Sequence, residues 1–412
     1  MTAYIITIGD ELLIGQITDT NSAFMSAALH EEGVEVIEQL SVSDTRTAIR
    51  SAIDRAFSKA DVVLMTGGLG PTKDDITKLV LAEYFSTELV FHAESWERLG
   101  RIYRQFGREP MDSHRQQCFL PAAAEILPNK LGTAPGMLLR KDGKILVSMP
   151  GVPYEMRYLV EHEVIPRLQA MAPDRMRQRS LTILTAGEGE SRVAEKIESV
   201  EDSLPEHMSL AYLPNLGTVR LRLTTRGTDD AAMQEELQHY QSQIEELIGH
   251  LVYGTGKKTL SMTIGELLQE RGLTLGTTES CTGGRIAQML TSVAGSSAYF
   301  YGSVVAYDNR IKRNVLGVKA ATLEQHGAVS EETIREMVAG GLDVLETDLV
   351  LATTGIAGPG GGTPTKPVGT IWIAVGNKDR IQTQLLKAGK DRERNITYTA
   401  HQALDLVRRF LQ

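Results

Sequence analysis

The sequence has few cysteines, no long apolar run and no excess of positive charge. Its two cysteines, Cys118 and Cys281, are too few for a disulfide framework and suit a reducing cytosol. No apolar run approaches the roughly 18 residues that cross a bilayer, and residues 4–8 read as a strand instead of a secretory leader. A formal net charge of −9 opposes nonspecific attachment to nucleic acid or anionic lipid. We therefore expect a cytoplasmic protein that binds neither membrane nor nucleic acid.

A chain of 412 residues exceeds what one hydrophobic core usually holds, so we expect two or three domains. In the first, residues 1–172, apolar strand-like runs alternate with amphipathic helices, a rhythm typical of a mainly parallel α/β sheet. Lys141-Asp142-Gly143-Lys144 predicts a hairpin turn. The predicted strands are 5–8, 34–40 and 61–65, and the predicted helices are 21–33, with Asn21 or Ser22 as its cap, 45–59, and one from about Asp74.

A smaller middle domain is predicted for residues 173–254, with strands at 179–185 and 218–225 and a helix at 231–248. This order resembles an α+β module of the KH type. A KH domain that binds RNA needs a basic G-x-x-G turn, whereas Gly187-Glu188-Gly189-Glu190 is acidic and differently spaced. We therefore expect a linking or dimerisation module.

A third, compact α/β domain is predicted for residues 255–412. At its start, Gly254-Thr255-Gly256-Lys257-Lys258-Thr259 is similar to a phosphate loop, but Leu251 stands where the Walker pattern needs glycine. We interpret this segment as a linker.

Ser280 lies in the third domain, between a predicted strand at 273–277 and a predicted helix at 284–290. Gly283 and Gly284 let a ligand approach the backbone, and the N–H groups of the first helical turn can bind an anion or oxyanion. Neighbouring Cys281 is an alternative nucleophile, although a small packing residue is the simpler interpretation.

A serine nucleophile needs a base. His326 and His401 stand in undistinctive contexts, whereas Lys312 follows a strand-like run at 303–305 within Tyr307-Asp308-Asn309-Arg310-Ile311-Lys312. Burial lowers the pKa of a lysine, so Lys312 can take the serine proton, with Tyr307 relaying or orienting it. The alternative is that Lys312 is a solvated helix residue.

Several motifs of this half together resemble the CinA C-terminal family, over about residues 257–412. They are Glu279-Ser280-Cys281-Thr282-Gly283-Gly284, Tyr307-Asp308-Asn309 with Lys312, Ala328-Val329-Ser330, and Thr354-Gly355-Ile356-Ala357-Gly358-Pro359 through Lys366-Pro367-Val368-Gly369-Thr370.

The resemblance implies a nicotinamide-nucleotide amidase that converts NMN to nicotinate mononucleotide and ammonia without a cofactor. Ser280 would be the nucleophile, Lys312 its base and Tyr307 a helper. Backbone amides of residues 281–284 would hold the oxyanion, and the loop 355–362 would hold the 5′-phosphate. Arg392 is either a phosphate or carboxylate contact or the start of a solvated helix. The implied substrate contacts are Thr282, Gly283, Gly284, Gly355, Ile356, Ala357, Gly358 and Arg392.

A second glycine loop, Thr66-Gly67-Gly68-Leu69-Gly70-Pro71-Thr72, follows a predicted strand in the first domain and can wrap a phosphate. Acidic residues follow three successive strands: Asp10 and Glu11, then Asp44, then Asp74 and Asp75. Parallel strands bring such loops to one edge, where carboxylates near a diphosphate suit Mg²⁺ or a similar ion. Helix capping is the alternative for each acid, above all for Asp74.

The first domain resembles the molybdopterin-binding fold, a three-layer sheet architecture, and more closely its CinA N-terminal branch. Gly9-Asp10-Glu11-Leu12-Leu13, Gly15 with Thr20-Asn21, the 66–77 stretch and Met149-Pro150-Gly151-Val152-Pro153 carry the match. The branch implies an ADP-ribose pyrophosphatase that needs Mg, Co or Mn. The implied metal ligands are Asp44, Asp74 and Asp75, and the implied substrate contacts are Gly9, Asp10, Glu11, Asn21, Gly67, Gly68, Gly70, Pro71, Thr72 and Gly151.

We predict a bifunctional, homodimeric enzyme of pyridine-nucleotide salvage. One half would split ADP-ribose to AMP and ribose 5-phosphate, and the other would deamidate NMN. One alternative is a molybdopterin-related binding protein. Another is an accessory protein for DNA uptake or damage, against which the acidic net charge counts.

Overall fold

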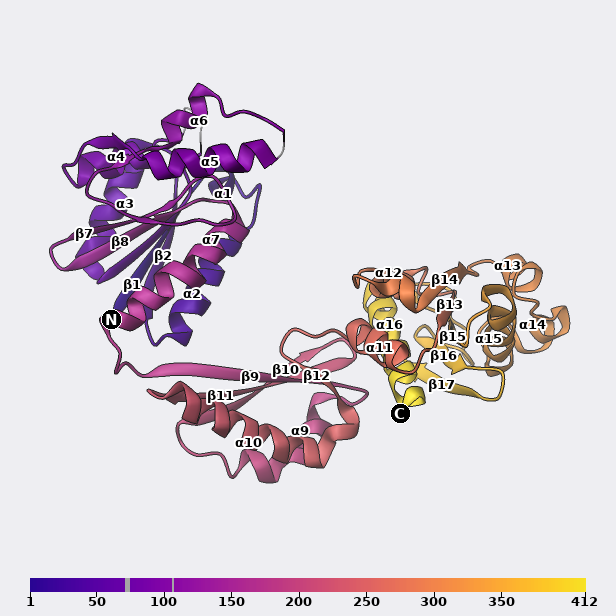
Figure 1. The fold of residues 1–412 in the computed structure, drawn as a ribbon. Helices are drawn as coiled ribbons and strands as arrows, with labels where there is room; N and C mark the ends of the chain where they lie inside the picture. The colour runs from indigo at the N-terminus through magenta and orange to yellow at the C-terminus, as the bar shows by residue number, and fades with distance from the viewer. Residues whose placement is uncertain (71–74, 106) are drawn as a thin grey trace. The chain divides into compact units, whose positions relative to one another are not determined.

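The computed structural model describes residues 1–70, 75–105 and 107–412, and the chain forms two compact units (Figure 1). The first unit comprises residues 1–179 and 226–233, and the second comprises residues 180–225 and 234–412. The division falls within β9 (Arg177–Ala186), β11 (Thr218–Gly227) and α10 (Asp230–Ile248). The middle domain therefore groups largely with the C-terminal domain.

The N-terminal unit contains a six-stranded sheet in the order β2-β1-β3-β8-β7-β6. Its strands are β1 (Thr2–Ile8), β2 (Glu35–Val42), β3 (Val62–Thr66), β6 (Glu125–Leu127), β7 (Gly136–Lys141) and β8 (Lys144–Met149). The first four strands of that order run parallel, and β7 and β6 are antiparallel additions. The mainly parallel sheet predicted from the sequence is confirmed.

Helices cover both faces of this sheet, which gives the predicted three layers (Figure 1). One core packs the sheet against α2 (Thr20–Glu31) and the continuous α7 (Pro153–Leu159), η1 (Val160–Val164) and α8 (Ile165–Met171). The other packs it against α3 (Arg46–Lys59) and α4 (Thr77–Tyr84). The remaining elements of this unit are α1 (Asp10–Leu13), α5 (Ala93–Gln105), α6 (Asp112–Gln117) and a two-stranded sheet of β4 (Leu89–Phe91) and β5 (Phe119–Pro121).

Two local predictions have different outcomes here. The hairpin turn between β7 and β8 is confirmed, with Asp142 and Gly143 at φ 51° and 76°, as a type I′ turn requires. The predicted cap of α2 is wrong, because Asp19 accepts hydrogen bonds from the backbone N–H groups of Asn21 and Ser22. The helix expected near Asp74 is α4, which begins at Thr77.

The middle domain has a four-stranded sheet, ordered β10-β11-β9-β12, with β10 at Met208–Asn215 and β12 at Val252–Thr255. Helices α9 (Glu190–Glu201) and α10 pack on it around an apolar cluster. The linker interpretation of residues 254–259 is wrong in part. Residues 252–255 pair with β9 as an edge strand, and the backbone N–H of Gly256 donates to the Thr182 carbonyl.

The C-terminal domain is built on a five-stranded sheet ordered β14-β13-β15-β16-β17. The strands are β13 (Leu275–Glu279), β14 (Phe300–Val305), β15 (Leu349–Gly355), β16 (Thr370–Gly376) and β17 (Ile381–Lys387). β14, β13 and β15 are parallel, whereas β16 and β17 are antiparallel.

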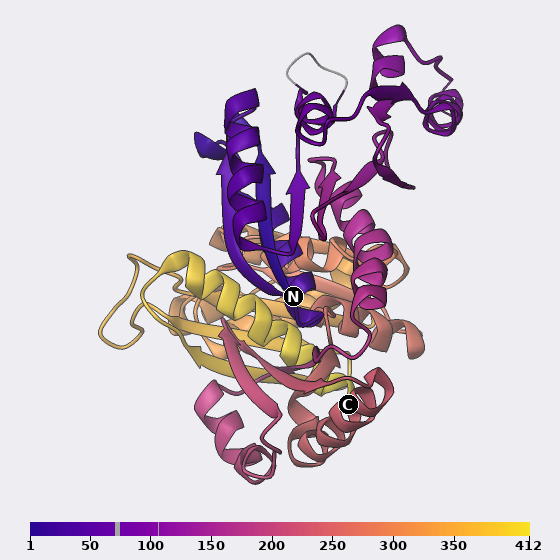
Figure 2. The same ribbon diagram turned by 90° about the vertical axis from the view of Figure 1, so that its left-hand side faces the viewer.

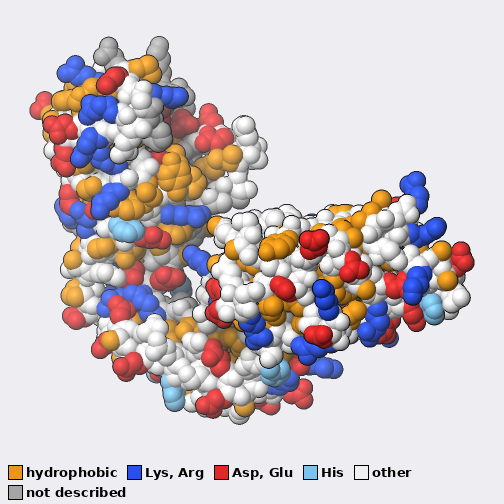
Figure 3. Space-filling view, turned by 45° about the vertical axis from the view of Figure 1, so that its right-hand side comes forward, with side chains coloured by type: hydrophobic (Ala, Val, Ile, Leu, Met, Phe, Trp, Pro, Cys, Tyr) orange, Lys and Arg blue, Asp and Glu red, His pale blue; other side chains and the backbone are white. Residues whose placement is uncertain are grey.

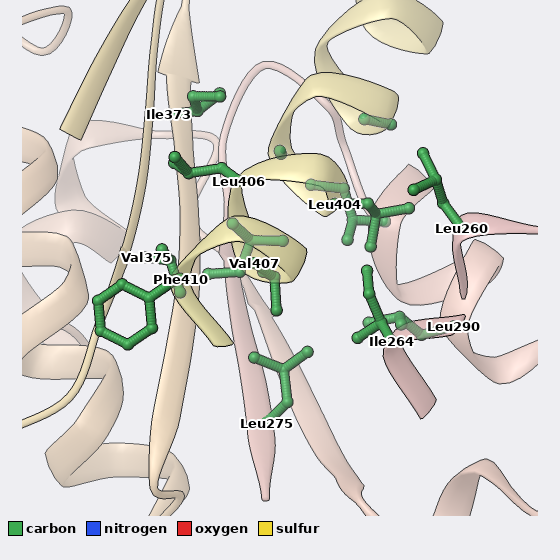
Figure 4. Packing of buried hydrophobic residues seen from close by; sticks show 14 of the residues in the cluster. Leu260, Ile264, Leu275, Leu290, Ile373, Val375, Leu404, Leu406, Val407 and Phe410 are labelled. Carbon is green, nitrogen blue, oxygen red and sulfur yellow. The ribbon is translucent and has the colours of Figure 1, made fainter. Parts of the chain in front are cut away.

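Both faces of this sheet are also covered by helices. α11 (Leu260–Glu270), α12 (Arg285–Thr291) and α16 (Arg392–Leu411) enclose the larger core, whose buried side chains include Leu404, Val407 and Ile264 (Figure 4). Figure 2 shows α16, in yellow, along the yellow strands. The other face carries α15 (Glu331–Leu345), near α13 (Asn309–Asn314) and α14 (Ala320–His326). The 3-10 turn η3 (Ser296–Ala298) precedes β14, and a second 3-10 turn, η2 (Gly249–Leu251), links α10 to β12 in the middle domain.

Among the described residues, no helix is long and apolar enough to cross a membrane. On the face drawn in Figure 3, basic and acidic side chains are interspersed without a continuous band of one sign.

Leu404 provides a test of the larger core, because its side chain is fully buried in α16. We expect Leu404→Ala to lower the free energy of unfolding of the C-terminal domain by about 2–5 kcal/mol, since it removes apolar contacts and leaves a cavity. Urea denaturation followed by Trp372 fluorescence measures this, in a Trp96→Phe background that removes the other tryptophan. The control Leu385→Ala, at a side chain 42% exposed, should cost far less; equal losses would contradict the packing.

Candidate active site

Ser280 stands directly after β13, one of the parallel strands of the C-terminal sheet. Its backbone N–H donates to the Thr353 carbonyl of the neighbouring strand at 2.9 Å. The Thr282 hydroxyl lies 2.7 Å from the Thr353 hydroxyl, which ties the turn to β15 a second time. The serine side chain is therefore held at the carboxyl ends of the strands, where open α/β sheets bind ligands.

The amine of Lys312 meets the hydroxyl of Ser280. Lys312 Nζ lies 3.1 Å from Ser280 Oγ, 2.7 Å from the Ala306 carbonyl oxygen and 3.4 Å from that of Tyr307. The lysine is 1% exposed, so the alternative of a solvated helix residue is wrong. Burial lowers the pKa of Lys312, against smaller opposing effects of Cys281 and Asp308.

The arrangement suits a neutral amine. A neutral lysine has two N–H groups, which the two carbonyl oxygens can accept, and one lone pair, which can then accept the proton of the serine hydroxyl. The two histidines named in the sequence analysis make contacts elsewhere: His326 faces Glu332, and the Cβ of His401 packs near Gly217.

Glu279 stands one residue before Ser280, and its role was not predicted from the sequence. It is fully buried, and its carboxylate accepts the backbone N–H groups of Gly284, Ile286 and Ala287 at 2.8–3.2 Å. This carboxylate therefore caps α12 and fixes the serine turn. An acid between a predicted strand and a predicted helix was the available sequence signal.

The Glu279 cap reduces the number of backbone N–H groups in residues 281–284 that can bind an oxyanion. The N–H of Gly284 is taken by Glu279, and that of Gly283 donates to the Ser280 carbonyl at 3.1 Å. In the described part of the chain, the N–H groups of Cys281 and Thr282 have no oxygen acceptor. These two amides are the ones available to an oxyanion.

The Cys281 side chain fits the packing interpretation. Burial raises the pKa of its thiol to about 12, so the thiol is neutral near pH 7. It belongs to the large apolar cluster of the domain.

The side chains of Tyr307 and Arg392 contact each other. The Arg392 guanidinium donates to the Tyr307 hydroxyl at 2.7 Å and to the Gly358 carbonyl at 2.8 Å. The Tyr307 side chain is exposed, and its hydroxyl makes no hydrogen bond to Ser280 or Lys312 among the described residues. Only the Tyr307 carbonyl contacts the lysine amine.

In the predicted phosphate loop, residues 355–362, some backbone N–H groups already bind other parts of the chain and some do not. Gly355 ends β15, where an added Cβ would lie 2.6 Å from Ile371, and the Ile356 N–H donates to the Thr370 carbonyl. The N–H groups of Ala357 and Gly358 have no acceptor within the described ranges, and they adjoin the Arg392 contact. Buried Asn395, which sequence analysis missed, holds the Ala357 carbonyl at 2.9 Å.

A cavity of about 450 Å³ lies at the carboxyl ends of β1, β3 and β8 in the N-terminal unit. Predicted residues that line it are Gly9, Glu11, Asp44, Gly67, Gly68, Gly70, Asp75 and Gly151. Asp10 contributes its backbone N–H to the Asp44 carboxylate, and Asn21 donates to the Gly151 carbonyl at 2.8 Å. Pro71, Thr72 and Asp74 lie outside the described residues.

Glycine is required where this loop leaves β3. Gly67 has φ 112°, and an added Cβ would lie 2.3 Å from the Ile8 carbonyl oxygen. Its N–H donates to the Met149 carbonyl, and its carbonyl accepts from the Thr77 hydroxyl. The loop is thus fixed between three elements, with its open side toward the cavity.

The acidic residues of the cavity do not form a complete metal site. Burial raises the pKa of Asp44; a hydrogen bond from Asp10 opposes this, and the negative charges of Glu11, Asp10 and Asp75 reinforce it. Within residues 1–70, 75–105 and 107–412, no three His, Cys, Asp or Glu side chains are placed to hold a metal by themselves. Mg²⁺ usually binds through one or two carboxylates plus substrate phosphates, so these residues fit an ion that arrives with a diphosphate.

Sequence analysis also missed Glu155, which lines the same cavity and is 8% exposed. It stands two residues after the Met149-Pro150-Gly151-Val152-Pro153 motif.

Comparisons with known proteins match all three domains. Residues 4–170 match the probable molybdopterin binding domain, residues 180–254 the KH domain of damage-inducible protein CinA, and residues 257–411 the CinA C-terminal domain. The fold and site thus define a three-domain α/β protein with an N-terminal molybdopterin-binding-like domain.

Relatives match over the whole length. A CinA-like protein of Flavobacterium psychrophilum is 42% identical over 99% of this chain and 98% of its own, and one of Chloroherpeton thalassium is 44% identical over 100% and 99%. The chain belongs to the CinA family. The solved competence/damage inducible protein of Agrobacterium tumefaciens is 38% identical, covers 37% of this chain and 94% of its own, and has a TM-score of 0.37. Family membership suggests a hydrolase-type role.

The buried lysine gives a prediction for stability against pH. Because the pKa of Lys312 is lowered in the folded state, the unfolded chain binds more protons between that value and the ordinary 10.5. Stability from this site therefore rises with pH through that window.

We expect Lys312→Met to be more stable than the parent at pH 7, with the advantage shrinking by pH 9.5. Urea midpoints reported by Trp372 measure this, with exposed Lys378→Met as the control. A difference independent of pH would contradict the lowered pKa.

Proposed function

We propose that this chain is a bifunctional hydrolase of pyridine nucleotides. Its C-terminal domain deamidates NMN to nicotinate mononucleotide and ammonia. Its N-terminal domain cleaves ADP-ribose to AMP and ribose 5-phosphate with a divalent ion. The observation that carries the first activity is the 3.1 Å contact between a buried lysine amine and the Ser280 hydroxyl.

The amidase reaction starts with Lys312 neutral. Ser280 Oγ attacks the carboxamide carbon while its proton passes to Lys312 Nζ. The carbonyl oxygen gains negative charge, which the N–H groups of Cys281 and Thr282 are available to stabilise; one such donor is typically worth about 2.7–4 kcal/mol. The ammonium form of Lys312 then returns the proton to the leaving nitrogen, and ammonia departs.

A water molecule completes the cycle. Lys312 takes a proton from water, whose oxygen attacks the acyl carbon; the proton then passes to Ser280 Oγ as the ester bond breaks. Nicotinate mononucleotide leaves, and the Ser280–Lys312 pair is restored. Lys312 and Ser280 carry out these proton transfers together with the substrate and one water molecule.

Arg392 supports the assignment of a nucleotide substrate. It is exposed and fixed between the Tyr307 hydroxyl and the Gly358 carbonyl, and this second contact places it beside the unpaired amides of Ala357 and Gly358. A guanidinium beside free backbone N–H groups is a suitable phosphate site. We assign Tyr307 to positioning Arg392.

The N-terminal activity rests on the glycine loop and the acids that share one cavity. The loop would bind the diphosphate, and Asp44 and Asp75 would hold a divalent ion against it. Such an ion supplies Lewis-acid polarisation of the phosphorus centre. These carboxylates repel one another, and a bound cation would relieve that repulsion.

For the amidase, we expect Ser280→Ala to lower kcat/KM for ammonia release from NMN at least about 10³-fold, because no acyl-enzyme forms. Lys312→Met should have a comparable effect. The matched control is Arg313→Met, an exposed cation next to Lys312 in α13, which should stay within about twofold. Equal ammonia release by the parent and Ser280→Ala would show that this serine is not the nucleophile.

For the pyrophosphatase, we expect ADP-ribose cleavage to stop in EDTA and to return when Mg²⁺, Mn²⁺ or Co²⁺ is added. Asp44→Asn and Asp75→Asn should each lower kcat at least about 10²-fold, because each removes a carboxylate ligand. AMP release measured by chromatography checks this, with exposed Asp174→Asn as the control. Undiminished cleavage in EDTA would rule out the metal role.

A further inference from the structure

Glu155 is a buried carboxylate of the N-terminal cavity that phosphate and metal binding leave unused. It lies in α7 and is 8% exposed. Its Oε2 accepts a hydrogen bond from Asn129 Nδ2 at 2.6 Å. In the described part of the chain no donor reaches its Oε1, although the residue lines the cavity.

The surroundings of Glu155 hold its carboxylate in one place. Asn129 is fully buried; its Oδ1 accepts from the N–H groups of Leu131 and Gly132, and its Nδ2 also donates to the Ala134 carbonyl. A Cβ on Gly132 would lie 1.7 Å from Glu155 Oε2, so the carboxylate rests directly on that backbone. An acceptor fixed in this way is prepared for a ligand and is not a solvated surface group.

Glu155 is also separate from the proposed metal ligands. The charges that act on Asp44 come from Glu11, Asp10 and Asp75, whereas the charge that acts on Glu155 comes from Arg98. Burial raises the pKa of Glu155, and the Asn129 hydrogen bond and Arg98 oppose that change. The cavity thus has an acidic group near the metal position and a single carboxylate elsewhere on its wall.

We propose that Glu155 accepts a hydrogen bond from the ribose 2-hydroxyl of the nucleotide whose phosphate lies on the 67–70 loop. An ionised carboxylate only accepts hydrogen bonds, so its ligand partner must be a donor. The sugar of a nucleotide is attached to the phosphate and offers hydroxyl donors within the same cavity. An acid that binds ribose hydroxyls serves the same purpose in dinucleotide-binding folds. This role rests on the proposed N-terminal function and makes Glu155 a specificity residue for ribose.

The test compares ligands with and without the 2-hydroxyl group. Binding of AMP and 2′-deoxy-AMP, and of ribose 5-phosphate and 2-deoxyribose 5-phosphate, is measured by calorimetry with Mg²⁺ on the full-length parent and Glu155→Gln. The glutamine keeps the size and the acceptor for Asn129, but it turns an N–H₂ group toward the cavity. We expect the parent to favour at least one ribose ligand roughly 10- to 100-fold over its deoxy analogue.

In Glu155→Gln that preference should fall to about twofold, with the affinity for the deoxy ligand unchanged. Glu155→Asp should keep part of the preference for the ribose ligand. Glu161→Gln, at an exposed glutamate just after α7, should keep the preference in full. No preference in the parent, or an intact preference in Glu155→Gln, would overturn the proposal. A clear preference without ADP-ribose cleavage would instead overturn the pyrophosphatase and leave the ribose contact standing.

Discussion

The C-terminal site depends on a lysine amine that the fold keeps out of water beside a serine hydroxyl. A charged ammonium is costly to bury without a counter-ion, and among the described residues the hydrogen-bond partners of Lys312 Nζ are two carbonyl oxygens and the Ser280 hydroxyl. Burial therefore shifts Lys312 toward the neutral amine, which is the form that accepts a proton. Burial, which usually selects for apolar residues, here creates the base.

The same geometric rule produces both candidate sites. In each sheet, neighbouring parallel strands end at one edge, so loops that are distant in sequence meet there. The turns after β13, β14 and β15 bring together Ser280, Lys312 and the Thr353 contacts. The turns after β1, β3 and β8 form the N-terminal cavity. Helices on both faces bury the sheets and leave that edge for chemistry.

Carboxylates serve different purposes according to what surrounds them. Glu279 accepts hydrogen bonds from three backbone N–H groups and fixes the serine turn. Asp44 lies among other acids, a setting that favours a cation. Glu155 is fixed by an amide and keeps one oxygen open. Residue type alone does not separate these cases, because the difference lies in which hydrogen-bond donors the fold brings to each acid.

The sequence by itself determined the three-domain organisation, the mainly parallel sheet of the N-terminal domain, the Asp142–Gly143 turn and the candidate nucleophile and base. These follow from local periodicity, turn chemistry and motifs that are continuous along the chain. Only the tertiary structure decided that Lys312 is buried, that Glu279 occupies the amide of Gly284, that Tyr307 contacts Arg392, and that residues 252–255 join a sheet. Each of these depends on partners far away in sequence, and the desolvation and hydrogen bonding that set their chemistry exist only after the strands and helices pack.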